Sequence, residues 1–399
     1  MDQVTTATGA PADGKEGRTL FALVSAAFLM RSTYVVLPFL TSLMAASGGW
    51  SPESASLAFA AMGAGGLVGA LAAGSFGDRF GLRRALFACL LGAACITPLL
   101  WVSTQTPAQS LLVVASTAFM LGLLLDGYRP LASAAVGHAV PSAGRQKAFG
   151  LVASAGIAGG IVGPLVAGWL SRESWSLLFV QQAVGVLVVV AILAWGLPRD
   201  TTPPKRRRGA TGYGSTWRRA KFLLLCTLLF AMATSQMLST FPLYLLRQGI
   251  DTAFYGVLLS INSAVALIVL LPIIALGKQV RAEPAIAACA AIVAVGTGCL
   301  WMSPSAFVLI FYSAAIGVAS SLMFVVGPAR ASSLADPAHM GAMHSLYGTS
   351  VALGLVLGPS IGGWLLHSQG PNVLIAFSVA CSIASGILIL FQPNEIRAA

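Results

Sequence analysis

The stretch GIAGGIVGPLVAGWL at residues 156–170 returns as VALGLVLGPSIGGWL at residues 351–365, 195 positions further along the chain. Small residues at this spacing allow two helices to pack closely, and a proline bends the helix that contains it. A repeat on this scale predicts a chain made of two related halves. The identical positions are Gly159, Gly163, Pro164, Gly168, Trp169 and Leu170 in the first copy and Gly354, Gly358, Pro359, Gly363, Trp364 and Leu365 in the second.

Twelve apolar runs extend outward from the repeat through both halves, each bounded by charged residues or by Gly, Pro and Ser. A helix needs about 20 apolar residues to cross the hydrocarbon core of a bilayer. The chain is therefore predicted to be an all-α membrane protein with twelve transmembrane helices in two pseudo-symmetric six-helix bundles. The predicted spans are 20–46, 54–76, 85–103, 109–137, 148–170 and 176–197 in the first half and 222–246, 253–276, 284–302, 305–329, 341–366 and 371–391 in the second.

The composition excludes the main alternatives to a membrane protein. The 399 residues are 57% hydrophobic and 9% charged, whereas an ordinary soluble domain carries about 25% charged residues. The net charge of +11 would suit nucleic acid only on a water-exposed basic surface, and no such domain is predicted. The six cysteines fall inside apolar runs without a CxxC pair or a histidine cluster, so neither a metal site nor a cofactor is predicted.

The distribution of Lys and Arg predicts how the chain lies in the membrane. With the amino terminus inside, 19 of the 23 cationic residues fall on the inner side, whereas only Arg172 and Arg247 fall outside. Arg31 and Arg129 lie within spans. Because cationic loops stay on the cytoplasmic side, both termini are predicted to be cytoplasmic in a multi-pass protein of the plasma or inner membrane. A monomer is expected.

Five segments follow from these boundaries. They are a cytoplasmic tail at 1–19, an N-terminal six-helix bundle at 20–197, a basic cytoplasmic linker at 198–220, a C-terminal six-helix bundle at 221–391 and a tail at 392–399. The linker is rich in proline and contains the run KRRR, so we expect it to favour the anionic surface of the lipid bilayer.

The loop after the second span reads GSFGDRFGLRRAL at residues 74–86. It resembles the signature loop of the major facilitator superfamily and departs from it mildly at Phe76 and Leu82. The resemblance implies a secondary transporter with the twelve-helix major facilitator fold and a role for this loop in conformational change. The residues that carry it are Gly74, Asp78, Arg79, Gly81, Arg83 and Arg84.

The fifth span resembles the motif of the antiporter branch of the same superfamily, through Gly159, Gly163, Pro164 and Gly168. This resemblance implies proton-coupled export, although close helix packing alone would favour the same residues. The arginine that drug antiporters often carry in the fourth span is absent, and Ala118 stands at its place. The later pair Asp126 and Arg129 resembles a variant found in one bacterial multidrug branch.

Asp126 is the only carboxylate predicted to lie deep within a span. An ionised side chain inside the bilayer costs at least about 2.5 kcal/mol, so it needs a partner, a cavity or a function. The corresponding residues in the second half, Ser321 and Phe324, are not ionisable, so the pair of Asp126 and Arg129 breaks the symmetry. We expect Asp126 to bind and release the driving proton under the control of Arg129 or Arg31. A permanent ion pair that only holds helices together is the alternative.

Several polar side chains are candidates to bind a small-molecule substrate. Arg31 and Tyr34 share one face of the first span, and Arg31 would either bind an anionic group or pair with Asp126. Four-residue steps place further candidates on one face of the seventh span, and another lies in the eighth. Such a mixed polar and aromatic set favours an amphipathic organic molecule. These further residues are Gln236, Thr240, Tyr244 and Asn262.

Three functions compete on these residues. The leading hypothesis is proton-coupled export of small amphipathic molecules by alternating access. Uptake or exchange of a small organic anion would instead use Arg31 and Arg129 as the substrate clamp. A polytopic membrane enzyme is disfavoured, because no nucleophile, metal cluster or pair of carboxylates is predicted at depth. The ATP-binding pattern GxxxxGK[ST] is also absent.

Overall fold

The structure of the protein is a computed structural model, and it describes residues 14–47, 49–105, 110–140, 144–198, 213–276, 281–334 and 340–391. Twelve segments of this part of the chain are long and apolar enough to cross a membrane, as the sequence predicts. The first seven helices are α1 (Gly14–Thr33), α2 (Val36–Ser47), α3 (Pro52–Phe80), α4 (Leu82–Thr104), α5 (Leu111–Ala139), α6 (Arg145–Glu173) and α7 (Ser176–Gly196). The others are α8 (Tyr213–Thr234), α9 (Phe241–Arg247), α10 (Thr252–Leu276), α11 (Ala282–Gly298), α12 (Ala306–Leu334), α13 (Met340–Ser368) and α14 (Pro371–Leu390).

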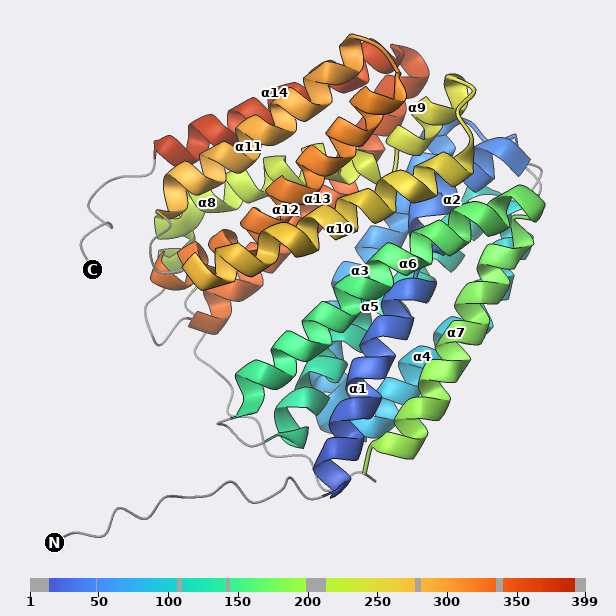
Figure 1. Ribbon diagram of the computed structural model, residues 1–399, viewed down its shortest axis with the longest axis vertical. Coiled ribbons are helices and arrows are strands. Elements are labelled where there is room, and N and C mark those ends of the chain that lie inside the picture. The colour runs from blue at the N-terminus through green and yellow to red at the C-terminus, as the bar shows by residue number, and fades with distance from the viewer. Residues whose placement is uncertain are drawn as a thin grey trace, which may run out of the picture.

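The helices form two bundles, α1 to α7 and α8 to α14, as Figure 1 shows. In the first bundle α1 packs on α6, α3 on α5 and α4 on α7, and in the second α8 packs on α13, α10 on α12 and α11 on α14. The bundles meet through α6 against α10 and α3 against α13. The predicted two-bundle architecture is therefore confirmed.

The first span of each half is broken, although the sequence predicts continuous helices at 20–46 and 222–246. The chain leaves the helix at Tyr34, between α1 and α2, and passes through a 3-10 turn at Ser235–Met237 between α8 and α9. Pro38 and Pro242 explain both breaks. A proline lacks the amide hydrogen and crowds the carbonyl four residues earlier, which here lies within the break.

Several helices run past the predicted ends of their spans at the predicted inner side. For example, α3 continues to Phe80 and α12 to Leu334, because polar side chains in the last turns reach the interface without ending the helix. As a result Arg330, predicted in an inner loop, lies within α12 and is 7% exposed. Of the predicted linker, 199–212 lies outside the described residues, as do 1–13 and 392–399 of the tails, and α8 already begins at Tyr213.

The contacts between the bundles concentrate at one end of the molecule. Within the described residues, the hydrogen bonds that join the bundles come from the second half of α6, from Pro38 at the start of α2, and from Asp251 and the first half of α10. Tyr255 donates to the carbonyl of Pro38 at 3.2 Å, and Ser260 donates to that of Ile161 at 2.7 Å. The bundles diverge toward the other end, where α6 and α8 begin (Figure 1). The molecule is closed on the predicted outer side and diverges on the predicted inner side.

Candidate functional site

A cavity of about 200 Å³ lies between the two bundles, next to both helix breaks. Arg31, Tyr34 and Pro38 line it from the first bundle, together with Gly160 and Pro164 of α6. The break after α1 places Tyr34 outside regular helix, one turn beyond Arg31. The second bundle contributes Thr234, Ser235, Met237, Leu238, Leu259, Asn262, Ser263, Ile316, Ser320 and Leu355, and the first adds Leu37.

Asp126 and Arg129 lie beside this cavity and form an ion pair within α5, with 3.1 Å between Oδ1 of Asp126 and Nε of Arg129. Their side chains are 24% and 61% exposed, respectively. The Arg129 guanidinium lies 6.0 Å from the centre of the Tyr34 ring, so α1 and α5 bring together the charged groups that the sequence singles out. Asp126 is also the one carboxylate in the middle of a described membrane helix.

The Asp126 carboxylate fits against α3 only because residue 66 is a glycine. A Cβ atom added at Gly66 would collide with Oδ2 of Asp126. The two helices pack closely on either side of this position, where Gly65 faces the backbone of Phe119 and Gly69 faces that of Leu123. The packing of α3 on α5 therefore determines where the carboxylate lies.

Arg31 has no carboxylate partner among the described residues. Its side chain is exposed in the divergent space between the bundles rather than packed in a core. A Cβ added at Gly160 would lie 3.5 Å from Nε of Arg31 and 3.3 Å from Oγ of Ser263. Arg31 thus faces polar groups of the second bundle across a glycine of α6.

The second bundle supplies neutral polar groups to the cavity. Asn262 lines it, as the sequence suggests, and its amide nitrogen donates to the carbonyl of Ser313 at 3.1 Å. Sequence reasoning missed Thr234, Ser235, Ser263 and Ser320. The break that Pro242 predicts could have indicated Thr234 and Ser235, whereas serines within a helix carry no comparable signal.

Three predicted substrate ligands lie away from the cavity lining in this conformation. Gln236, Thr240 and Tyr244 are all buried. Thr240 donates to Oε1 of Gln236 at 2.6 Å, and Nε2 of Gln236 donates to the carbonyl of Met232 at 2.9 Å. Gln236 thus bonds to the backbone of α8 beside the break, and Thr240 bonds to Gln236.

The signature loop joins α3 to α4 at the predicted inner side. Gly81 has φ of 90°, a left-handed conformation that a side chain disfavours. Arg83 donates to the carbonyl of Ala194 at 3.0 Å and so caps the end of α7. Among the other residues of the loop, Gly74 is half-buried, whereas Asp78, Arg79 and Arg84 are exposed.

The glycines of the fifth-span motif allow α6 to approach two helices. Gly159 and Gly163 face the backbone of α1, where a Cβ atom would collide with Phe28 or Ser32. Gly168 lies against α10 instead, on the other bundle. Pro164 lies between these two contacts and lines the cavity. The motif is therefore located where the two bundles move relative to each other if the cavity changes sides.

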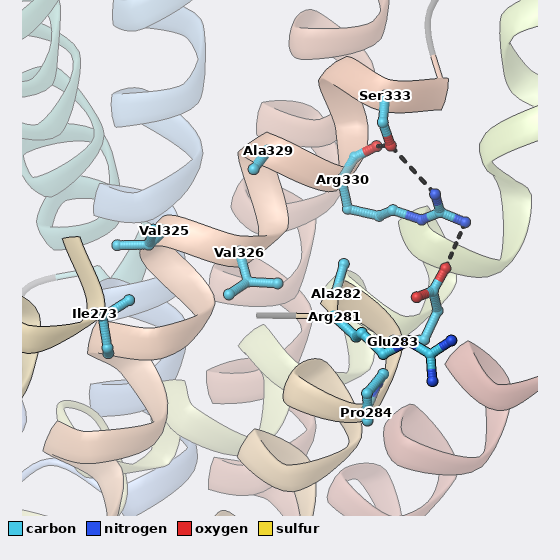
Figure 2. Close-up of a pocket in the computed structure, with 10 residues that line it drawn as sticks. All are labelled: Ile273, Arg281, Ala282, Glu283, Pro284, Val325, Val326, Ala329, Arg330 and Ser333. Atoms are coloured by element: carbon cyan, nitrogen blue, oxygen red, sulfur yellow. Dashed lines mark hydrogen bonds and ion pairs between the residues drawn. The ribbon is translucent and has the colours of Figure 1, made fainter. Parts of the chain in front are cut away.

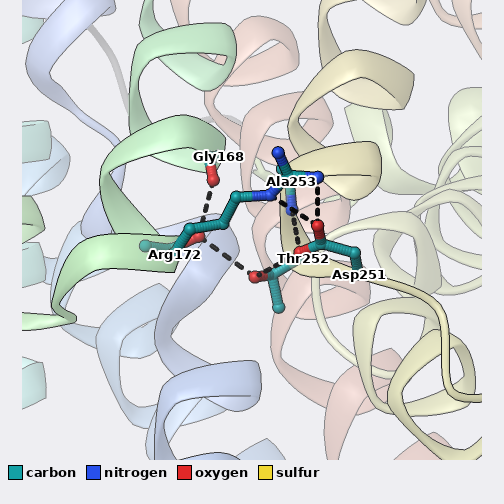
Figure 3. Close-up of polar contacts among 6 residues, drawn as sticks. Gly168, Arg172, Asp251, Thr252 and Ala253 are labelled. Carbon is teal, nitrogen blue, oxygen red and sulfur yellow. Dashed lines mark hydrogen bonds and ion pairs between the residues drawn. The ribbon is translucent and has the colours of Figure 1, made fainter.

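A group of polar contacts, which we call the latch, joins the end of α6 to the start of α10 at the predicted outer end of the molecule (Figure 3). Arg172 at the end of α6 forms an ion pair with Asp251, which precedes α10. Ser171 and Thr252 add a hydrogen bond of 3.1 Å across the same interface. Slight burial raises the pKa of Asp251, but the Ala253 amide and the Arg172 guanidinium outweigh it and hold the pKa below its ordinary value of 3.8.

Breaking the latch is expected to shift molecules toward the outward-open arrangement. Asp251→Asn removes an exposed ion pair worth about 0–1 kcal/mol, so the population ratio should change by about fivefold at most. Distances between spin labels at Ser174 and Met302, measured in a cysteine-free background, report this change. Since the pKa of Asp251 is lowered, the latch contributes above its ordinary pKa and is lost only as pH falls through the lowered value.

Arg247→Ala is the matched control for the latch. Arg247 is an exposed cation on the same side, but its Nη1 donates to the carbonyl of Leu366 within the second bundle. Its removal should leave the distance distribution unchanged. An equal shift in both variants, or no shift in Asp251→Asn, would show that the latch does not hold the outer end closed.

Two six-helix bundles, closed over a central cavity at one end and diverging at the other, define a membrane carrier. Comparison with known proteins supports the assignment to the membrane carriers. The sequence profile of the Major Facilitator Superfamily matches residues 20–302 and 248–398. The chain belongs to this superfamily, and it is a secondary transporter rather than an enzyme.

Individual relatives fit this assignment. The uncharacterized MFS-type transporter YhjO of Bacillus subtilis (strain 168) is 26% identical over 340 residues, which cover 82% of this chain and 81% of that protein. The multidrug resistance protein MdtH of Enterobacter sp. (strain 638) is 26% identical and covers 87% and 86%, respectively. The fold also matches a crystal structure of a peptide transporter, POT, in complex with sulfate, with a TM-score of 0.80, 16% identity and 99% coverage of both chains.

Proposed function

We propose that this transporter exports small amphipathic organic molecules in exchange for protons, with both termini in the cytoplasm and Asp126 as the proton carrier. The observation that carries the proposal is the position of Asp126 beside the central cavity, in contact with Arg129 and close to Tyr34. A carboxylate at mid-membrane is costly unless it has a function. The similarity to a protein described as a multidrug resistance protein supports export.

The ion pair suggests how binding of a proton changes the conformation of the carrier. When Asp126 is ionised, its charge is matched by Arg129 at 3.1 Å. Protonation neutralises the Asp126 carboxylate. The positive charge of Arg129 then has no matching negative charge and faces the positive charge of Arg31 in the same space. Repulsion between the two guanidinium groups then favours the conformation that separates α1 from α5 or admits water between them. Deprotonation on the other side of the membrane restores the pair and resets the carrier.

Flux in proteoliposomes under an imposed pH gradient tests this function. The purified chain should transport a lipophilic dye against its own gradient when the side that receives the dye is acidic, and reversal of the pH gradient should reverse net flux. Transport that is equal with and without the gradient would contradict proton coupling. Net movement of dye in the same direction as the protons would contradict exchange.

A specific observation favours a small organic anion as a second candidate substrate. The cavity and its surroundings contain two guanidinium groups and one carboxylate, and Arg31 has no carboxylate partner among the described residues. The site therefore has an excess of one positive charge when Asp126 is ionised. The neutral donors of Asn262 and Ser263 are suited to the polar end of a carboxylate- or phosphate-bearing molecule.

Arg31→Gln separates the two candidates. A charge-assisted hydrogen bond is worth about 1.5–3 kcal/mol, so the KM for an anionic substrate should rise by about 10- to 100-fold. The KM for its neutral ester should change little, and Arg31→Lys should recover part of the loss. An equal loss for the acid and the ester would assign Arg31 to the structure of the site rather than to recognition of charge.

A further inference from the structure

A second cavity, of about 380 Å³, lies in the second bundle at the predicted inner side, between the end of α10, the start of α11 and the end of α12. It is separate from the transport site, since it shares no lining residue with the central cavity. One wall is apolar and is formed by Ile273, Val325, Val326 and Ala329. The opposite wall carries Arg281, Glu283, Arg330 and Ser333, as Figure 2 shows.

Arg330 is the unusual group in this wall. Its side chain is only 8% exposed, yet it lines the cavity. Nη1 donates to Oγ of Ser333 at 3.2 Å, and Nη2 lies 2.6 Å from Oε1 of Glu283. Its Nε has no hydrogen-bond partner among the described residues. A buried donor without a partner is costly, so this cavity is one that an acceptor would stabilise.

The other groups of the wall also favour an anion. Arg281 is exposed at the edge of the cavity and precedes the first turn of α11, which its side chain does not cap. Helix N-termini attract negative charge. The two arginines outnumber Glu283, which leaves an excess of one positive charge. The position at the ends of three membrane helices corresponds to the depth of lipid headgroups.

We propose that this cavity binds a phosphate group through Arg330 and Arg281, with the apolar wall contacting the remainder of the molecule. The chemistry is shared by the phosphodiester of an anionic lipid and by free phosphate. The apolar wall favours the lipid, because Val325 and Val326 offer contacts to a glycerol and acyl chain that free phosphate does not need. Glu283 competes with the anion for Arg330.

This competition gives the test opposite signs in two variants. The purified full chain is reconstituted in phosphatidylcholine to which phosphatidylglycerol is added. The phosphatidylglycerol that it retains is then measured by native mass spectrometry. Arg330→Gln should bind about tenfold more weakly, since it loses charge-assisted hydrogen bonds. Glu283→Gln should bind more tightly, because it frees Arg330. A purely structural ion pair would not move the two variants in opposite directions.

Two further variants guard against a folding defect. The double variant Glu283→Gln with Arg330→Gln leaves no unpaired charge and should still bind weakly. Arg247→Gln at the predicted outer side should bind as the parent does, because Arg247 donates to a carbonyl within its own bundle. Competition by inorganic phosphate would identify free phosphate as a sufficient ligand, and its failure to compete would assign the site to the lipid. Parent-like retention by the double variant, or the same direction of change in both single variants, would overturn the proposal.

Discussion

Replacing Asp126 with Asn is expected to reduce transport driven by a pH gradient to the rate of liposomes without protein. The amide keeps the size of the side chain but cannot carry the proton, so the step that couples the gradient to substrate is lost. Exchange of labelled for unlabelled substrate at equal pH on both sides should continue, because it requires only binding and the change of conformation. Radiotracer exchange and gradient-driven uptake, measured on the same vesicles, provide the comparison.

Two control variants separate coupling from structure. Asp126→Glu retains a titratable group and should keep part of the driven flux. Glu53→Gln removes an acidic group near the start of α3 and should transport as the parent does. If Asp126→Asn loses exchange as well as driven flux, and if Asp126→Asn with Arg129→Gln recovers both, the ion pair has only a structural role within α5 and does not carry the proton.

Replacing Gly66 with Ala is expected to remove the same driven flux, although no charged residue is replaced. The added methyl group would occupy the position of Oδ2 of Asp126. The carboxylate is expected to move, because the atoms that the methyl group meets all belong to the Asp126 side chain. The pair with Arg129 at 3.1 Å is then disrupted. Overpacking of this kind costs about 1–3 kcal/mol, so the melting temperature should also fall.

Gly137→Ala is the matched control for this substitution. It makes the same chemical change on α5 at a place where a Cβ atom meets nothing within 4 Å. Alanine favours helix over glycine by about 1 kcal/mol, so this variant should be as stable as the parent or more so. If Gly66 acts through Asp126, Gly66→Ala should keep exchange at equal pH on both sides, as Asp126→Asn does. A Gly66→Ala protein with parental driven flux would contradict the proposed geometry.

The sequence predicts the membrane architecture well, for reasons that concern individual segments. Each apolar run had to be long enough to cross the bilayer, so hydropathy alone located the twelve spans. The breaks within the first and seventh spans were missed, because a run such as 20–46 shows no change in polarity. Pro38 and Pro242 were visible in the sequence, but prolines in other spans remain within continuous helices, including Pro98 and Pro164.

The charged residues were partly predictable. Asp126, Arg129 and Arg31 stand out because ionisable groups in an apolar run are rare, and the structure places all three around the central cavity. The placement of Gln236 and Thr240 could not be predicted. A polar side chain on a helix either faces a cavity or bonds to its own backbone, and the local break in the helix decides between the two. Arg330 was assigned to a loop because charge alone marked the end of its span.

By itself the sequence determined the number of spans, the duplication and the asymmetric pair of Asp126 and Arg129, because these depend on local polarity and on comparison of one half with the other. Only the tertiary structure decided which helices approach closely enough to bring charges together. Gly66 positions the carboxylate, and the latch at Arg172 joins the two bundles at one end, through contacts between residues distant in the chain. Such contacts depend on packing in three dimensions, which the periodicity of a single helix does not encode.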